Sequence, residues 1–360
     1  MDGKAIEMLG NPDQVVGRIV ELYNDSPAVV LYPIILLMVT LFYLCSGTKN
    51  SGRGRRTSSV YVGEITKEHL YCSRTTIGDG STSELLKPMS ERNLKPNSSH
   101  LKTSHWSDMG ARQYQEDRYV IERIGKTKSG SPVSYYGVFD GHGGFEASQY
   151  CADRLSLYIR NEPNFPDGDI GGAMHDSYMK IDEDFIATGK PDGTTVCTCI
   201  VVGGEKIYCA NTGDSRAIVV KRGGGTFAMS KDHKPGDPDE TKRITDLGGT
   251  VVYWGRWRVE SVLAVSRAVG DASLMPYITA EPDVVEKDIE EDDLFLVIAS
   301  DGVWDVLESD RVGKFVFQNT VDEGKTDDEL LRWIGRKLCV EAGDCGSGDN
   351  VSVVVVDLKK

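Results

Sequence analysis

The chain has 360 residues, of which 39% are hydrophobic and 27% are charged; this is enough apolar material for a sizeable core and argues against collagen, coiled coil and extensive disorder. Lysine and arginine total 41 against 55 aspartate and glutamate residues, giving a formal net charge of −14 at pH 7. This acidic balance argues against nucleic acid as the main partner, because a phosphate backbone selects basic surfaces.

An uncharged run near the N-terminus predicts a transmembrane helix at residues 27–45 (PAVVLYPIILLMVTLFYLC). At a rise of about 1.5 Å per residue, these 19 residues nearly span a hydrocarbon core about 30 Å thick. The preceding residues 1–26 are acidic, whereas a cleaved signal peptide begins with a short basic region. A buried or interfacial helix remains the alternative.

Basic residues follow this run closely, at Lys49, Arg53, Arg55 and Arg56. The positive-inside bias therefore predicts a single-pass membrane protein with residues 1–26 outside the cytoplasm and the rest of the chain inside it. Residues 46–100 are rich in Ser, Thr, Gly, Lys and Arg and poor in large apolar side chains, which is typical of a flexible linker. Its basic part could also rest on anionic lipid.

From residue 101 to residue 360 the pattern is that of one folded domain, with short apolar runs alternating with segments of helical spacing. The strands expected are Ser134–Phe139, Thr194–Val202, Lys206–Ala210, Ala217–Lys221, Leu294–Ala299 and Val351–Val356, and the helices are Phe145–Arg160, Ile170–Ala187, Pro238–Leu247 and Asp327–Glu341. Several strands are joined by short Gly-containing turns, which favours antiparallel pairing. We therefore expect an α+β fold built in layers.

The eight cysteines are scattered, with no Cys-x-x-Cys pair. This indicates reduced thiols of a cytosolic domain more than a disulfide framework or a zinc site. No cysteine has an arginine six positions later, so the chain lacks the loop of thiol-dependent phosphatases.

Acidic residues stand at the ends of apolar strands. Asp140-Gly141 and Asp301-Gly302 each follow such a strand, and Asp349 shortly precedes another. Buried carboxylates repel one another unless a cation compensates them, and oxygen ligands of this kind suit Mg²⁺ or Mn²⁺. Any one Asp-Gly pair can also be an ordinary turn, so the prediction of a metal site rests on their recurrence.

Further charged residues fall in similar places. Asp214 and Asp305 lie in or near such loops, where a turn and a helix cap are the simpler interpretations. Arg112 stands shortly before Glu116 and Asp117, and its planar guanidinium is suited to hold two phosphate oxygens.

From about Trp106 to Asp357 the chain resembles the metal-dependent serine/threonine protein phosphatases of the 2C, or PPM, type. The resemblance is carried by seven segments in the order of that family: GARQYQED (110–117), VFDGHGG (138–144), NTGDSR (211–216), DHKP (232–235), LAVSRAVGD (263–271), SDGVWDV (300–306) and GDNVSVV (348–354). Two departures are Glu260-Ser261, where the family often has Asn-Gly, and an aromatic and basic stretch at Trp254–Arg258.

The resemblance implies a four-layer α/β/β/α sandwich of two antiparallel sheets flanked by helices, with two Mg²⁺ or Mn²⁺ ions at one end. It implies that Asp140 bridges the ions, that Gly141 binds one through its carbonyl, and that Asp301 and Asp349 bind the other. Glu116 would hold metal-bound water, with Asp117 supporting it. By the same resemblance, Asp214 and Asp305 join Asp301 at a weaker third metal site.

The implied activity is hydrolysis of phosphoserine and phosphothreonine in proteins by direct attack of a water activated by two metals. Arg112 would hold the phosphate, and His142, with an ordinary pKa of about 6.5, would protonate the leaving alkoxide. His142 as a structural turn residue is the alternative. We expect a monomeric catalytic domain.

The sequence offers two alternatives to a metal-dependent phosphatase. Asp237 begins a DxDxT pattern typical of hydrolases that form an aspartyl phosphate, but the segment before it is polar and contains proline, whereas such a nucleophile ends a buried strand. The other rival is a catalytically inactive, membrane-tethered module that binds phosphoproteins; the presence of every implied ligand argues against it.

Overall fold

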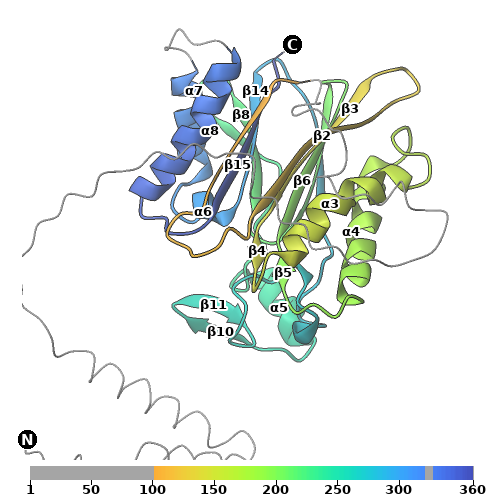
Figure 1. Cartoon of the computed structure of the whole chain (residues 1–360), viewed down its shortest axis with the longest axis vertical. Helices are drawn as coiled ribbons and strands as arrows, with labels where there is room; N and C mark the ends of the chain where they lie inside the picture. The colour runs from red at the N-terminus through yellow and green to blue at the C-terminus, as the bar shows by residue number, and fades with distance from the viewer. Residues whose placement is uncertain (1–100, 321–326, 360) are drawn as a thin grey trace, which may run out of the picture. The chain divides into compact units, whose positions relative to one another are not determined.

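The computed structural model describes residues 101–320 and 327–359 (Figure 1). The predictions for residues 1–26, 27–45 and 46–100 lie outside these described residues. Among the described residues, no helix combines the length and the apolar character needed to cross a bilayer.

Two five-stranded sheets form the centre of the domain, and every pairing within them is antiparallel. The first sheet has the order β13 (Asp283–Asp288), β7 (Lys206–Thr212), β6 (Val196–Val202), β3 (Pro132–Phe139) and β2 (Arg118–Lys126). The second has the order β1 (Thr103–Asp108), β15 (Val351–Asp357), β14 (Asp293–Ala299), β8 (Arg216–Lys221) and β9 (Thr226–Ala228).

Helices cover the outer face of each sheet, as Figure 1 shows. The first sheet is covered by α3 (Glu146–Asn161) and α4 (Ile170–Ile186), and the second by the short α6 (Asp301–Trp304), α7 (Ser309–Asn319) and α8 (Asp327–Asp344). The expected α/β/β/α sandwich is therefore confirmed.

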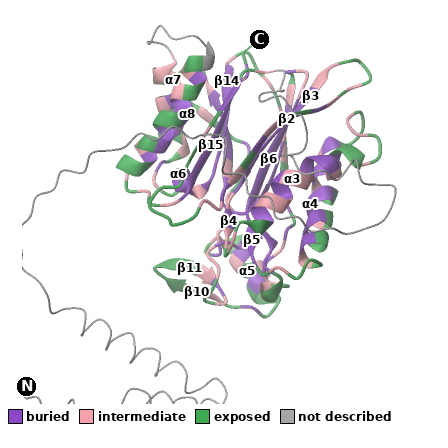
Figure 2. Cartoon of the chain, viewed as in Figure 1, coloured by how far each residue is buried: buried purple, intermediate pink, exposed green. Residues whose placement is uncertain are grey.

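Three clusters of buried side chains hold these four layers together. Figure 2 shows that the residues of the central strands are mostly buried. Successive residues of a strand point to opposite faces, so in β3 Tyr135 packs against the helices while Tyr136 and Val138 fill the space between the sheets. In β14 both faces are buried, which is why Leu294–Ala299 reads as a continuous apolar run.

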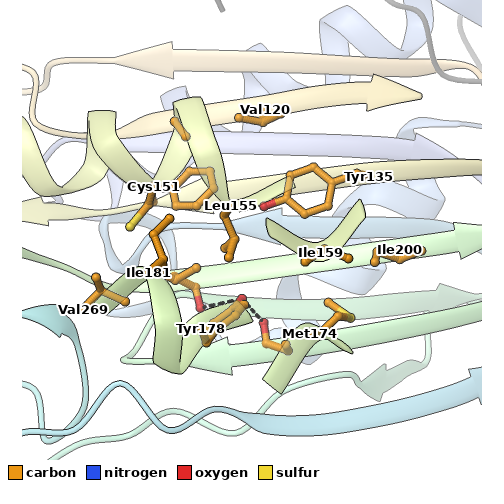
Figure 3. Packing of buried hydrophobic residues seen from close by; sticks show 14 of the residues in the cluster. Val120, Tyr135, Cys151, Leu155, Ile159, Met174, Tyr178, Ile181, Ile200 and Val269 are labelled. Carbon is orange, nitrogen blue, oxygen red and sulfur yellow. Dashed lines mark hydrogen bonds between the residues drawn. The ribbon is translucent and has the colours of Figure 1, made fainter. Parts of the chain in front are cut away.

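The core beneath α3 and α4 also contains a satisfied polar group (Figure 3). The hydroxyl of Tyr178 donates to the carbonyl of Ala210 at 2.8 Å and lies 2.8 Å from the hydroxyl of Thr198. A buried hydroxyl without such partners would destabilise the fold by about 1–3 kcal/mol. These bonds therefore fix α4 over strands β6 and β7.

A smaller unit packs at one end of the sandwich. It comprises α5 (Pro238–Asp246), the hairpin of β10 (Val251–Trp254) and β11 (Arg256–Val259), and a short helix η3 (Ala272–Leu274). Its own small core includes Ile244, Val259 and Ile278. A three-stranded sheet of β12 (Val269–Gly270), β5 (Gly193–Thr194) and β4 (Gly141–His142) lies at the same end.

Each expected strand and helix overlaps an observed one, but the expected strand Thr194–Val202 is divided into β5 and β6 at Thr195. Several observed elements were not predicted from the sequence, among them β1, β2, β13 and α7. Strand β13 (DVVEKD) alternates between half-buried and exposed residues at a sheet edge, and α7 (SDRVGKFVFQN) buries only a narrow face. The described cysteines are free thiols, as expected.

Candidate active site

The antiparallel sheets bring acidic residues from distant parts of the chain to one end of the sandwich. Arg118 pairs with Phe139, so Asp117, just before β2, comes beside Asp140, just after β3. In the second sheet Ala299 pairs with Val353, and the acids that flank these strands, Asp301 and Asp349, meet at the same end. We call Asp140, Asp301 and Asp349, together with Glu116, Asp117, Asp214 and Asp305, the strand-end centre.

The carboxylates of the strand-end centre lie close enough to disturb one another. Burial raises the pKa of Asp140 well above its ordinary value, and repulsion from Asp117 and Asp301 raises it further. Burial and repulsion from Asp214 and Asp305 likewise raise the pKa of Asp301 to about 8. This part of the molecule therefore carries more negative charge than its own surroundings stabilise.

The turn that carries Asp140 and Gly141 is fixed by neighbouring backbone. The carbonyl of Asp140 accepts hydrogen bonds from the amide of Thr195 at 2.9 Å and from the hydroxyl of Thr194 at 3.0 Å. A side chain at Gly141 would place its Cβ only 2.7 Å from the carbonyl oxygen of Glu116. Glycine thus allows the Asp140 and Glu116 segments to touch.

Asp117 supplies evidence that this centre suits a cation. One carboxylate oxygen accepts a hydrogen bond from the Ser300 hydroxyl at 2.9 Å, whereas the other is buried without a hydrogen-bond partner. Burial is the main cause that raises the pKa of Asp117 to about 6, despite hydrogen bonds from Ser352 and Ser300 that act in the opposite direction. A donor set made of carboxylate oxygens with unmet charge fits a hard divalent ion such as Mg²⁺ or Mn²⁺.

Asn350, which the sequence analysis did not single out, holds the loop that bears Arg112 and Glu116. Its side-chain oxygen accepts from the amide of Glu116 at 2.8 Å, and its side-chain nitrogen donates to the carbonyls of Met109 at 2.9 Å and Tyr114 at 3.0 Å. Asn350 is buried. Its position directly after Asp349 was the one signal in the sequence.

Arg112 lies at the mouth of a cleft of about 240 Å³. Asp301, Asp305 and Asp349 line the same cleft. The guanidinium is 57% exposed and donates to Asp349 across 2.6 Å, so it reaches the acids and still faces solvent. An exposed, charged donor at the rim of a cleft is well placed to take a phosphate.

His142 is held by Asp271, a second residue whose role the sequence analysis missed. The Nε2 atom of His142 lies 2.7 Å from a carboxylate oxygen of Asp271. Burial alone would lower the pKa of His142, but the hydrogen bond and the negative charge of Asp271 raise it above its ordinary value. Asp271 is the last residue of the LAVSRAVGD segment, and this position was the feature of the sequence that could have indicated a role at the site.

Asp214 and Asp305 also belong to the strand-end centre. Lys234 lies 2.7 Å from Asp305 and 3.4 Å from Asp214, and Arg256 of the hairpin lies 2.7 Å from Asp305. Burial is the main cause that raises the pKa of Asp214 to about 6, while Lys234 opposes the shift. Neither cation was predicted from the sequence.

The structure excludes Asp237 as a nucleophile of the DxDxT type. Asp237 is the N-cap of helix α5, where its carboxylate accepts from the amide of Asp239 at 3.0 Å, and it pairs with Lys231 at 2.8 Å. It does not end a strand, and capping and the ion pair already use its carboxylate.

A second group of acids, Glu290, Asp292 and Asp293, is geometrically tighter. Among residues 101–320 and 327–359 it is the one trio of metal-ligating side chains whose ligand atoms all lie within 4.8 Å of one another. Lys221 and Lys287 pair with it, at 2.7 Å from Glu290 and 2.6 Å from Asp293 respectively. We call it the lysine-paired cluster; two lysines of the chain offset most of its charge.

Comparison with known proteins places this arrangement in a family. The family described as Protein phosphatase 2C matches residues 107–351. A protein of Oryza sativa subsp. japonica called "Probable protein phosphatase 2C member 13, mitochondrial" is 41% identical over 260 residues, which cover 71% of this chain and 68% of that protein.

Two solved structures show the same fold. One, titled "Structure of a C.elegans sex determining protein", has a TM-score of 0.65 and 29% identity, over 72% of this chain and 65% of that one. The other, "Crystal structure of serine-threonine phosphatase 2C from Toxoplasma gondii", has a TM-score of 0.62 and 23% identity, over 73% of this chain and 97% of that one.

Proposed function

This chain belongs to the protein phosphatase 2C family and is a metal-dependent protein serine/threonine phosphatase, and we propose that the strand-end centre is where it hydrolyses its substrates. The observation that carries the proposal is the group of buried, mutually repelling carboxylates beside an exposed arginine in one cleft.

We assign the metal ligands by position. Asp140, Asp301 and Asp349, with the carbonyl of Gly141, would hold two Mg²⁺ or Mn²⁺ ions, and Glu116 and Asp117 would support them. Asp214 and Asp305 would add a weaker third site with Asp301. When bound, such a pair of divalent ions makes a nucleophilic water available near neutral pH and offsets charge on the phosphoryl group.

The chain's own residues then bind and protonate the substrate. Arg112 at the cleft mouth binds the phosphate oxygens and offsets the charge that spreads over them during in-line attack. His142, whose pKa is raised by its contact with Asp271, donates its proton to the leaving serine or threonine oxygen. Asn350 binds the loop that carries Arg112 and Glu116 and so holds these two residues near Asp349.

Turnover by the full chain tests the proposal. Phosphoserine and phosphothreonine peptides should be hydrolysed after addition of Mn²⁺ or Mg²⁺, and excess chelator should abolish the reaction. Equal turnover in excess chelator would overturn the role given to the acids. A chain that binds phosphopeptides and never hydrolyses them would instead be an inactive binding module.

We also propose that residues 27–45 anchor the chain as a single membrane span, with the catalytic domain in the cytoplasm and residues 46–100 as the tether. The support is the 19-residue uncharged run and the four basic residues that closely follow it. Alkaline extraction of membranes tests the anchor, because a spanning segment stays in the pellet and a peripheral protein is released.

The substrates proposed are phosphoproteins, and the catalytic domain is proposed to act as a monomer, since the strand-end centre is assembled from a single chain. Light scattering of the detergent-purified chain, corrected for detergent, tests the monomer. A dimer that persists on dilution would contradict it.

A further inference from the structure

Two cationic side chains of the protein lie against the outer acids of the strand-end centre. Lys234 Nζ is 2.7 Å from Asp305 Oδ1, and Arg256 Nη1 is 2.7 Å from Asp305 Oδ2. Arg256 also approaches Asp301 Oδ2 at 3.9 Å. The carboxylate of Asp305 is therefore clamped between two cations of the chain.

These two cations are held differently. Lys234 belongs to the DHKP segment, whose neighbour His233 is buried and hydrogen-bonded to the Gly213 amide and to Asp283. Arg256 comes from the β10–β11 hairpin, and its side chain is 58% exposed. Lys234 is thus anchored in the domain, whereas Arg256 reaches the acids from a surface hairpin.

Arg256 is the link between the hairpin and the catalytic cleft. It lines the same cleft of about 240 Å³ as Arg112, Asp301 and Asp349. The base of the hairpin is fixed elsewhere, because Val259 packs in the small core. Nearer the tip, Trp257 packs against Gly236, where a Cβ would lie 2.3 Å from the indole. The tip can therefore lose the Arg256 contact without losing its base.

We propose that Arg256 is a built-in counter-cation that competes with a further divalent ion for Asp301 and Asp305, and so couples metal loading to the position of the β10–β11 hairpin. The inference rests on the proposed function of the strand-end centre. A guanidinium stays protonated at every physiological pH, so it competes under all working conditions.

The strength of the pair makes this competition reversible. Ion pairs between partly exposed groups contribute little, because water and salt screen them. A third divalent ion must break the Arg256 ion pair in order to bind, and this should lower its affinity only about three- to tenfold. Trp254, one of the five tryptophans of the chain, pairs with Arg256 at the hairpin tip and is 67% exposed, so its fluorescence reports on movement of the tip.

The test is Mn²⁺ binding to the full chain in detergent, followed by calorimetry and by tryptophan fluorescence. Three proteins are compared: wild type, Arg256→Ala and Arg258→Ala. Arg258 is the matched control, because it lies in the same strand but donates to the carbonyl of Val262 instead of an acid. Arg256→Gln, which keeps most of the side-chain length, is a second variant should Arg256→Ala disturb the hairpin.

We expect the two tighter binding events to be equal in all proteins and the third to be three- to tenfold tighter in both Arg256 variants. The third event should change tryptophan fluorescence in wild type and in Arg258→Ala but much less in the Arg256 variants. A third affinity that is equal in wild type and Arg256→Ala, or tightened equally by Arg258→Ala, overturns the inference. Loss of the two tighter events in wild type would instead refute the proposed function.

Discussion

Two acidic clusters of this molecule differ in how their charge is balanced. The lysine-paired cluster brings its carboxylate oxygens closest together, yet Lys221 and Lys287 offset most of its charge, and the hydrogen bond from Lys221 lowers the pKa of Glu290. The strand-end centre is more widely spaced, but burial and mutual repulsion raise the pKa of Asp140 and Asp301.

The comparison shows that proximity of carboxylates is a poor guide to a metal site. Even a buried acid such as Asp293 can lie close to other carboxylates when lysines reach it, and no further cation is then required. Buried acids with too few cations around them are unfavourable unless something binds to them. Unmet charge, in the strand-end centre, is therefore the property that marks a functional site in this chain.

Removing one carboxylate should lower activity in the strand-end centre and leave activity unchanged in the lysine-paired cluster. Asp301→Asn should lower kcat by roughly 10³-fold, because a catalytic metal contributes several kcal/mol to the transition state. Asp292→Asn in the lysine-paired cluster should leave kcat unchanged. Circular dichroism should show both variants folded; similar activity for the two would erase the distinction between the clusters.

Substitution of Arg112, the arginine of the cleft, should have the next largest effect on activity. Arg112→Ala should reduce kcat/KM by about 10²-fold through loss of a charged donor to the phosphate, and Arg112→Lys should recover only part, since a lysine lacks the planar fork. Arg160→Ala, an exposed arginine at the end of α3, serves as the control. Because Arg112 also pairs with Asp349, Mn²⁺ affinity should be measured alongside.

The contact between Asp271 and His142 should affect the pH dependence of kcat. Asp271 raises the pKa of His142, so the proton needed for the leaving group is retained to higher pH. In Asp271→Asn the pKa of His142 falls, and the alkaline limb of kcat should move to lower pH by on the order of one unit. Asp184→Asn, whose carboxylate accepts a hydrogen bond from Tyr158, is the control. An unmoved limb would show that Asp271 only supports the fold.

Unfolding without metal should reveal the charge imbalance. Asp117, Asp214 and Asp301 have pKa values raised to about 6, 6 and 8, so the folded state holds protons that the unfolded state releases above about pH 4. In chelator, the free energy of unfolding should therefore fall by several kcal/mol between pH 4 and pH 8.

Urea denaturation at pH 5 and pH 8 measures this loss of stability. Adding Mn²⁺ should restore stability more at pH 8 than at pH 5, and Asp301→Asn should lessen the pH dependence. A stability that rises with pH in chelator would contradict the account of the strand-end centre.

The sequence was sufficient to predict the fold class and the main acids. Strands buried on both faces, such as β3 and β14, appear as continuous apolar runs, and the aspartates beside glycines at their ends stand out against them. The seven ordered segments then assigned roles by resemblance to Asp140, Asp301 and Asp349.

The contacts that tune the centre could not be predicted from the sequence. Asp271 meets His142 across 129 residues, and Asn350 meets Glu116 across 234, so neither pair has a local pattern. Arg256 reaches the acids only because the hairpin of the smaller unit folds against the sandwich, and Lys234 meets Asp305 across 71 residues. Edge strand β13 was not predicted because both of its faces carry charged side chains and neither face is fully buried.

Anomalous diffraction at the manganese edge, from crystals of the protein soaked in Mn²⁺, tests the central claim most directly. The account predicts two strong peaks about 2.0–2.4 Å from oxygens of Asp140, Asp301 and Asp349. It predicts none at the lysine-paired cluster of Glu290, Asp292 and Asp293. Peaks at the lysine-paired cluster with none at the strand-end centre would contradict it.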